Sequence, residues 1–248
     1  MTALHVEVSG SGPDLVLLHG WAMHSGIWGS WVQQLSKYFR VHAIDLPGHG
    51  YSQPLVNNSL ESWSDAVLAV APKSAAWVGW SLGGLMAQSA VCKQPERIKS
   101  LVLLASTPCF VANKDWPDAV SVEVFEQFEQ QLSGDVEKTI LRFLSLQVRG
   151  SDSTARLLKM LRAAMRERPL PNKETLLAGL SLLQHSDLRS SLSDYVPALL
   201  LGERDTLVPA SLAAWLENSP SKIIKGAGHA PFLLHPGQCT DFILGQCA

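Results

Sequence analysis

A serine flanked by glycines ends an apolar run in WVGWSLGGLMAQ, residues 77–88. Such a serine is a nucleophile when a sharp turn between a strand and a helix exposes its hydroxyl. Residues 75–80 predict a strand and residues 82–94 a helix, which places Ser81 at their junction. Gly79 and Gly83 leave room for the turn, since a side chain there would collide with the adjacent strand or helix. The alternative is a serine that only caps the helix.

Attack by a serine hydroxyl at neutral pH needs a base, and the base needs an acid that orients it. Where the serine lies at such a turn between a strand and a helix, the acid and the histidine follow it in the chain. His229, in KGAGHAPF, lies in a glycine-bearing loop after the last predicted strand. Asp205, in LLLGERDTLVP, follows the strand before it, whereas Asp45 also ends a strand but precedes Ser81. We therefore predict that Ser81, Asp205 and His229 form a catalytic triad.

Other polar side chains near these motifs have simpler expected roles. His185 falls at the end of a helical segment, and His235 is better placed to begin the final helix. Glu203 is expected to be a solvated loop charge.

An acyl-transfer site also needs donors for the developing oxyanion. The backbone N–H of the residue after the nucleophile, Leu82, is one of them. The other is expected from LLHGWAMHSGIW, where a strand ends at His19, Gly20 frees the backbone and Trp21 offers its amide. We expect His19 to hold this loop by hydrogen bonds.

The 248 residues have an ordinary globular composition, with 46% hydrophobic and 17% charged residues. A formal net charge of −2 gives no overall attraction to nucleic acid or to an anionic membrane. No apolar run approaches the roughly 20 residues that span a bilayer, and the first residues lack a signal-peptide pattern. The cysteines show no metal-ligand spacing, so we expect free thiols in a reducing cytoplasm; they are Cys92, Cys109, Cys239 and Cys247.

Short apolar runs alternate with helical segments along both ends of the chain, which favours a doubly wound, mostly parallel α/β sheet. The predicted strands cover residues 4–10 (an edge strand), 14–19, 40–45, 75–80, 100–106, 196–202 and 221–226. Helices are predicted at about 27–37, 60–70, 82–94, 209–217 and 236–246. Between residues 111 and 185 the spacing is helical instead. We expect this insertion to be a cap over the carboxyl ends of the strands, where such sheets bind ligands. The alternative is that the insertion only adds helices at the edge of the α/β domain. The expected organisation is a core of residues 1–110 and 186–248 with a cap of residues 111–185.

Five ordered motifs, LLHGW, DLPGHGYS, GWSLGG, GERDTLVP and GAGHAPF, together resemble the α/β-hydrolase superfamily. HGWAMHSGIW, VGWSLGGLMA, RFLSLQ and LLQHSDLRSSL further resemble its carboxylesterases of biotin synthesis, which hydrolyse the methyl ester of pimeloyl-acyl carrier protein. The resemblance implies the same triad and no metal or cofactor. It implies oxyanion or substrate contacts from Trp21, Leu82, Phe143, Leu144, Ser145, Leu146 and Gln147.

Eight basic residues and two acidic ones lie between positions 138 and 168. On a helix, Arg156, Lys159, Arg162 and Arg166 would share an arc of about 120°. Carrier proteins are acidic, and the resemblance implies docking by basic cap residues. Lys138, Arg142 and Arg156 match, whereas Met160 stands where a basic residue is expected; Lys159 beside it is the expected substitute. The alternative is an ordinary solvated helix face.

We therefore predict a cytoplasmic, monomeric serine carboxylesterase acting on the methyl ester of pimeloyl-acyl carrier protein. One alternative keeps the triad and changes the substrate, as in a general short-chain esterase. Another, outside the enzymes, is a ligand receptor on the same scaffold.

Overall fold

The computed structural model describes residues 4–192, 195–216 and 218–247. Its centre is a seven-stranded sheet in the order β1-β3-β2-β4-β5-β6-β7, in which β1 is antiparallel to β3 and every other neighbouring pair is parallel. The strands are β1 Val6–Ser9, β2 Asp14–Leu18, β3 Arg40–Ile44, β4 Ala75–Trp80, β5 Ile98–Leu104, β6 Ala198–Gly202 and β7 Ser221–Ile224. The predicted doubly wound parallel sheet is confirmed.

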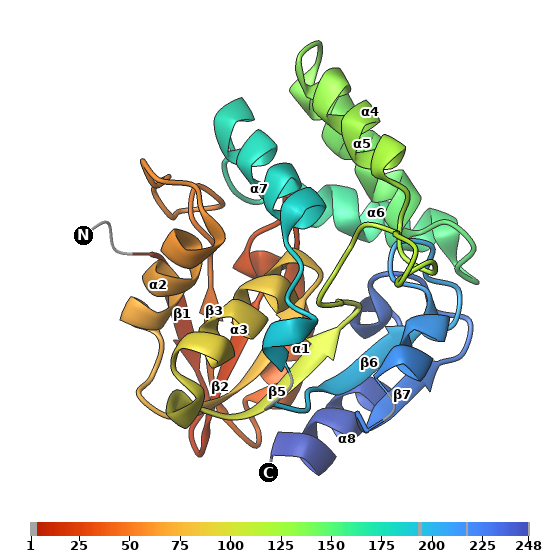
Figure 1. Ribbon diagram of the computed structural model, residues 1–248. Coiled ribbons are helices and arrows are strands. Elements are labelled where there is room, and N and C mark those ends of the chain that lie inside the picture. The colour runs from red at the N-terminus through yellow and green to blue at the C-terminus, as the bar shows by residue number, and fades with distance from the viewer. Residues whose placement is uncertain (1–3, 193–194, 217, 248) are drawn as a thin grey trace.

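Helices cover both faces of the sheet (Figure 1). The chain moves from β2 to β3 in one direction and from β3 to β4 in the other, so right-handed crossovers put the intervening helices on opposite faces. On one face α2 Leu60–Val70 packs against α3 Leu82–Lys93, and on the other α1 Gly29–Leu35 packs against α8 Pro236–Cys247. The central strand β4 is buried along its whole length, which explains its continuous apolar sequence.

Four helices follow β5 and stand together above the carboxyl ends of the strands (Figure 1). They are α4 Val122–Leu132, α5 Val136–Gln147, α6 Thr154–Met165 and α7 Lys173–His185. Asp135 caps α5 by accepting a hydrogen bond from the Lys138 N–H, and Asn172 caps α7 in the same way from the Thr175 N–H. Their buried apolar residues are continuous with the core of the sheet.

Several predicted elements differ in the structure. The segment predicted as a helix over 209–217 forms only a short 3₁₀ helix, η4 Ala210–Trp215, and residue 217 lies outside the described residues. The helix predicted at 27–37 begins instead with the 3₁₀ turn η1 Ser25–Trp28, where the side chain of His24 accepts from the Gly26 N–H. Within the described residues, no helix combines the length and apolar character needed to cross a bilayer.

Candidate active site

Ser81 lies in the sharp turn between β4 and α3 and has a φ of 53°, in the left-handed region. A residue other than glycine takes this conformation at a cost of roughly 1–3 kcal/mol, so the surroundings must hold it there. The Ser81 N–H donates to Leu104 O at 3.1 Å, and Ser81 O accepts from Ser106 Oγ at 2.7 Å. The turn therefore projects the serine from a fixed backbone.

The glycines beside Ser81 are required by close approach. A Cβ on Gly79 would lie 2.4 Å from Gly84 Cα, and a Cβ on Gly83 would lie 2.2 Å from Leu18 O on β2. Both distances are far below a normal contact, so any side chain at either position would push α3 away from the sheet. The predicted steric role of Gly79 and Gly83 is confirmed.

His229 and Asp205 meet above the same edge of the sheet. His229 Nδ1 lies 2.8 Å from Asp205 Oδ2, and both side chains are buried. Asp205 Oδ1 accepts from the N–H groups of Leu207 at 2.8 Å and Val208 at 3.0 Å. Because the carboxylate can only accept when ionised, it places the imidazole proton on Nδ1. The other nitrogen, Nε2, is thereby left as an acceptor.

The backbone of His229 is held by its neighbours on two sides. Its carbonyl accepts from Trp80 Nε1 at 2.7 Å, and Trp80 is the residue before the elbow serine. Its N–H donates to Gln147 O at 3.1 Å, at the end of α5. His229 Nε2 is buried and has no hydrogen-bond partner within the described residues. The structure thus joins His229 to Asp205 and, through Trp80, to the residue before Ser81. Within the described residues no hydrogen bond joins His229 Nε2 to Ser81. A buried imidazole nitrogen that is free to accept is the form that a general base needs.

The loop after β2 runs against the elbow. A Cβ on Gly20 would lie 3.2 Å from Ser81 Cβ and 3.3 Å from Trp80 Cε3, which is tighter than an ordinary contact, so glycine lets the backbone pass here without displacing its neighbours. His19 holds this loop: its Nε2 accepts from the Leu46 N–H at 2.9 Å, and its Nδ1 donates to Gly20 O at 2.8 Å. The structural role predicted for His19 is confirmed. In the described part of the chain, neither the Trp21 N–H nor the Leu82 N–H is hydrogen-bonded to another residue, as an oxyanion site requires.

Helices α5 and α7 cover this site closely. Trp21 Nε1 donates to Leu176 O of α7 at 2.9 Å, and its ring lies 4.7 Å from that of Phe143 on α5, centroid to centroid. A Cβ on Gly179 of α7 would lie 2.7 Å from Trp21 Cδ1 and 3.4 Å from Leu82 Cδ2. Ser81 is only 2% exposed and His229 is fully buried. The helices therefore exclude bulk water from the polar groups beneath them.

The five predicted cap contacts, residues 143–147, divide between two faces of α5. Phe143, Leu144 and Gln147 are buried, and the Gln147 side-chain amide has no hydrogen-bond partner among the described residues. Ser145 is exposed, with its hydroxyl bonded to Leu141 O, and Leu146 is half-buried. The helical repeat explains this split, since positions i, i+1 and i+4 share a face that excludes i+2. The structure thus brings Phe143 and Gln147 toward the site and turns Ser145 outward.

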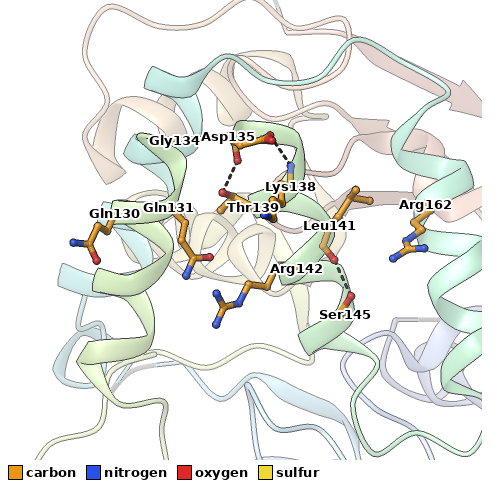
Figure 2. A pocket seen from close by; sticks show the side chains of 10 residues that line it. All are labelled: Gln130, Gln131, Gly134, Asp135, Lys138, Thr139, Leu141, Arg142, Ser145 and Arg162. Carbon is orange, nitrogen blue, oxygen red and sulfur yellow. Dashed lines mark hydrogen bonds between the residues drawn. The ribbon is translucent and has the colours of Figure 1, made fainter.

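The predicted docking residues lie on the outer surface of the cap. Lys138 and Arg142 line a groove of about 710 Å³ between α4, α5 and α6, with Arg162 on its far side (Figure 2). Arg156 and Lys159 are exposed on α6. The predicted amphipathic character of α6 is confirmed, because its apolar residues Leu157, Leu161 and Met165 are buried.

Two further residues, Asp45 and Ser106, support the site and are not predicted from the sequence. Asp45 was considered only as a triad acid, yet it is fully buried and binds the backbone of the loop that carries Trp21, through the Ser25 N–H. Ser106 holds the carbonyl of Ser81. The motif DLPGHGYS does contain a signal for this role of Asp45. A carboxylate that directly follows a buried strand needs hydrogen-bond donors, and the glycine-containing loop after it can supply backbone N–H groups. For Ser106 the sequence held no comparable signal.

Buried neutral histidines next to the site predict that the fold is sensitive to acid. Burial lowers the pKa of His19 to about 3 and that of His49 to about 4, against 6.5 when exposed. The unfolded state therefore takes up protons on these rings near pH 6.5, whereas the folded state does so only at lower pH. The free energy of unfolding is highest above about pH 6.5 and decreases as the pH falls. At pH 4.5 we expect the free energy of unfolding to be lower by about 2–3 kcal/mol per histidine than at pH 7. Denaturant unfolding across this pH range measures the difference.

The matched variant for this prediction is His49→Gln, which removes one titrating ring. Its unfolding free energy should depend less on pH between 7 and 4.5 than that of the unsubstituted protein. A free energy that stays level over this range in both proteins would contradict the prediction.

Comparisons with known proteins agree with this geometry. Residues 13–236 match the family model described as alpha/beta hydrolase fold. A pimeloyl-[acyl-carrier protein] methyl ester esterase of Nitrosomonas europaea is 43% identical over 97% of this chain and 99% of its own. Its counterpart in Xylella fastidiosa is 44% identical over 96% of both chains. Among solved structures, an esterase from Exiguobacterium antarcticum superposes with a TM-score of 0.85 at 18% identity, over 98% of this chain and 95% of that one, which supports the fold alone.

Proposed function

Because this chain belongs to the alpha/beta hydrolase fold family, and within it to the pimeloyl-[acyl-carrier protein] methyl ester esterases, we propose that it hydrolyses that ester to the free acid and methanol. Within biotin synthesis this step would end the elongation of the pimeloyl chain. The observation that carries the chemistry is the 2.8 Å contact of His229 Nδ1 with Asp205 Oδ2, which leaves Nε2 to act as an acceptor. The His229 carbonyl is bonded to Trp80, the residue before Ser81.

The proposed reaction has two halves. Ser81 Oγ attacks the ester carbonyl while His229 Nε2 takes the hydroxyl proton, and the N–H groups of Trp21 and Leu82 hold the oxyanion. His229 then gives this proton to the departing methoxide, and an acyl-enzyme remains. A water molecule, deprotonated by the same nitrogen, attacks the acyl-enzyme and returns Ser81 with release of the acid. Asp205 stabilises the imidazolium in both halves.

The segment 111–185 acts in this proposal as a cap, with the acyl chain beneath it against Phe143 and Leu144. Both side chains are buried apolar groups, and the Phe143 ring lies against that of Trp21. The side-chain amide of Gln147, which has no hydrogen-bond partner among the described residues, would supply a polar contact. The enzyme is further proposed to be a cytoplasmic monomer that binds neither nucleic acid nor membrane. Free thiols at all four cysteines are compatible with a reducing compartment.

We propose that the acyl carrier protein docks on the basic cap residues Lys138, Arg142, Arg156 and Lys159. All four are exposed, and none of them is ion-paired with a described acidic side chain. Opposite charge accelerates and orients the encounter of two proteins, and salt screens it. Docking on this face would bring the carrier to the outer side of the helices that cover the site.

Charge reversal at Arg142 and Arg156 should separate docking from chemistry. The double variant with Arg142→Glu and Arg156→Glu is expected to lower kcat/KM for the carrier-bound ester by about 10- to 100-fold at low salt. Its turnover of p-nitrophenyl butyrate should be unchanged, because the small ester needs no docking. Steady-state kinetics on both substrates measure the difference.

The control is the double variant with Lys37→Glu and Lys73→Glu, which makes the same change of net charge away from the cap. Both lysines are exposed and lie in the α/β part of the chain, residues 1–110. This control should keep full activity on both substrates. Equal losses on the carrier-bound ester in the two double variants would refute docking at the cap.

The function itself is tested by incubating the purified protein with the methyl ester of pimeloyl-acyl carrier protein and following the carrier by mass spectrometry. Loss of the methyl group, together with growth of a biotin-requiring host that lacks its own methyl esterase, is the expected result. Turnover of p-nitrophenyl butyrate without demethylation would instead indicate a general short-chain esterase. Turnover of neither substrate would favour a ligand receptor.

A further inference from the structure

We infer that Asp45 and Arg168 form a positioning pair that fixes the oxyanion loop, residues 19–25, and makes its position depend on the cap. The inference rests on the proposed esterase function. It assigns a role in the reaction to two residues that touch neither the triad nor the predicted substrate contacts.

Asp45 is a fully buried carboxylate that binds backbone on two sides. Its Oδ1 accepts from the Ser25 N–H at 2.6 Å, and its Oδ2 accepts from the Tyr51 N–H at 2.9 Å. Burial opposes its ionisation, but the charge of protonated His19 and these two backbone donors together hold the pKa of Asp45 below its usual range. The carboxylate is therefore charged at neutral pH and needs a cation nearby.

Arg168 supplies that cation from the segment after α6. Its Nη1 donates to Asp45 Oδ2 at 3.0 Å and to Ser25 Oγ at 2.8 Å. Its Nη2 donates to Glu7 Oε1 at 2.6 Å, and the guanidinium lies 4.9 Å from the centroid of the Tyr51 ring. Only 8% of the Arg168 side chain is exposed. A guanidinium held on all these sides has one position, unlike the solvated arginines of the cap surface.

These contacts fix the oxyanion loop at both ends. The His19 ring is bonded to the Leu46 N–H at the first end, and the Ser25 N–H is bonded to Asp45 at the last. Both ends are therefore attached to the same two residues after β3. Between them lie Trp21 and Ala22, and Ala22 has a φ of 59°. A non-glycine residue keeps such a φ only where its surroundings impose it.

The cap is attached to the same end of the loop. His24 Nε2 donates to Ala164 O in the last turn of α6 at 2.8 Å, next to the contact of Ser25 with Arg168. Two consecutive loop residues thus bind the end of α6 and the segment that follows it. A shift of that helix would move the loop and, with it, the Trp21 N–H.

The expected consequence is specific to the transition state. The oxyanion exists only in the tetrahedral intermediate and its transition states. Displacement of the Trp21 N–H should therefore lower kcat and leave binding of the substrate in its ground state almost unchanged. Removal of one oxyanion donor costs about 10²–10³ in kcat. A displaced donor should cost less, about 10- to 100-fold.

The test substitutes Arg168→Gln and measures kcat and KM for p-nitrophenyl butyrate, and the inhibition constant of an alkyl trifluoromethyl ketone, which forms a tetrahedral adduct with the serine. We expect kcat to fall by about 10- to 100-fold with KM changed less than about 3-fold, and the inhibition constant to rise by the same factor as kcat falls. Arg168→Lys should recover part of the loss. Arg166→Gln is the matched control, an exposed arginine two residues earlier, and should behave as the unsubstituted enzyme.

Should Arg168→Gln fail to fold, Ser25→Ala removes one contact of the same guanidinium and leaves the ion pair in place. It should give a smaller loss of kcat, again matched by the inhibitor. Unchanged kcat in the folded variants, or a loss of kcat without a change in the inhibition constant, would overturn the inference while leaving the esterase intact. If the unsubstituted protein shows no turnover that depends on Ser81, the proposed function fails instead.

Discussion

Replacing Ser81 by alanine is expected to lower kcat/KM for p-nitrophenyl butyrate by at least about 10⁴-fold. The substitution removes only Oγ, the atom proposed to form the acyl-enzyme. Alanine keeps the same Cβ at the same backbone conformation, so the positive φ of the elbow costs no more than it does with serine. Steady-state kinetics measure the loss, and thermal unfolding should show a stability close to that of the unsubstituted protein.

Ser89→Ala is the control for this substitution. Ser89 lies on the same helix, α3, where its buried hydroxyl donates to Ser64 Oγ. Its removal should cost some stability and little activity. Retention of full turnover by the Ser81→Ala protein would eliminate the serine-esterase mechanism, whatever the resemblance to esterases.

Asp205→Asn is expected to lower kcat by about 10³- to 10⁴-fold. Asp205 Oδ1 already accepts from the N–H groups of Leu207 and Val208, so the oxygen of the new amide should stay there. The amide NH₂ would then face His229 Nδ1 and donate to it. This forces the imidazole proton onto Nε2, where it blocks the acceptor that the serine hydroxyl needs. The rate of turnover and the rate of labelling by a fluorophosphonate should fall together.

Glu203→Gln provides the comparison for the acid. Glu203 is exposed, and its Oε2 accepts from the Gly226 N–H at 2.9 Å, which the amide oxygen of glutamine can replace. We expect activity within a few-fold of the unsubstituted enzyme. The assignment of the acid would be wrong if Glu203→Gln removed activity and Asp205→Asn retained it.

The parts of the fold that could be predicted from the sequence depend on local pattern. Strands buried on both faces read as short apolar runs, and β4 matches its predicted range at residues 75–80. Ser81, Asp205 and His229 are predicted to form a triad because each follows a predicted strand, and parallel strands end at one edge of the sheet. The contact of His229 with Asp205 is therefore a consequence of topology.

The remaining features depend on contacts between distant segments, which no local pattern reports. In the sequence Arg168 is only one of eight basic residues between positions 138 and 168, and the fold alone brings it to Asp45, 123 positions away in the chain. Ser145 was grouped with Phe143 because they are neighbours in sequence, yet the helical repeat turns Ser145 outward. A helix is predicted at 209–217, but the described residues of this segment contain the short 3₁₀ helix Ala210–Trp215 instead.

Ser81 Oγ is proposed to carry the acyl group in the acyl-enzyme. The most direct test of this proposal is covalent labelling of the nucleophile. The purified enzyme is treated with a fluorophosphonate, digested and mapped by tandem mass spectrometry. We expect a single phosphonylated site at Ser81, which is absent from the Ser81→Ala protein and forms far more slowly in the Asp205→Asn protein. A stoichiometric adduct on any other residue, with Ser81 unmodified and the enzyme inactivated, would contradict it.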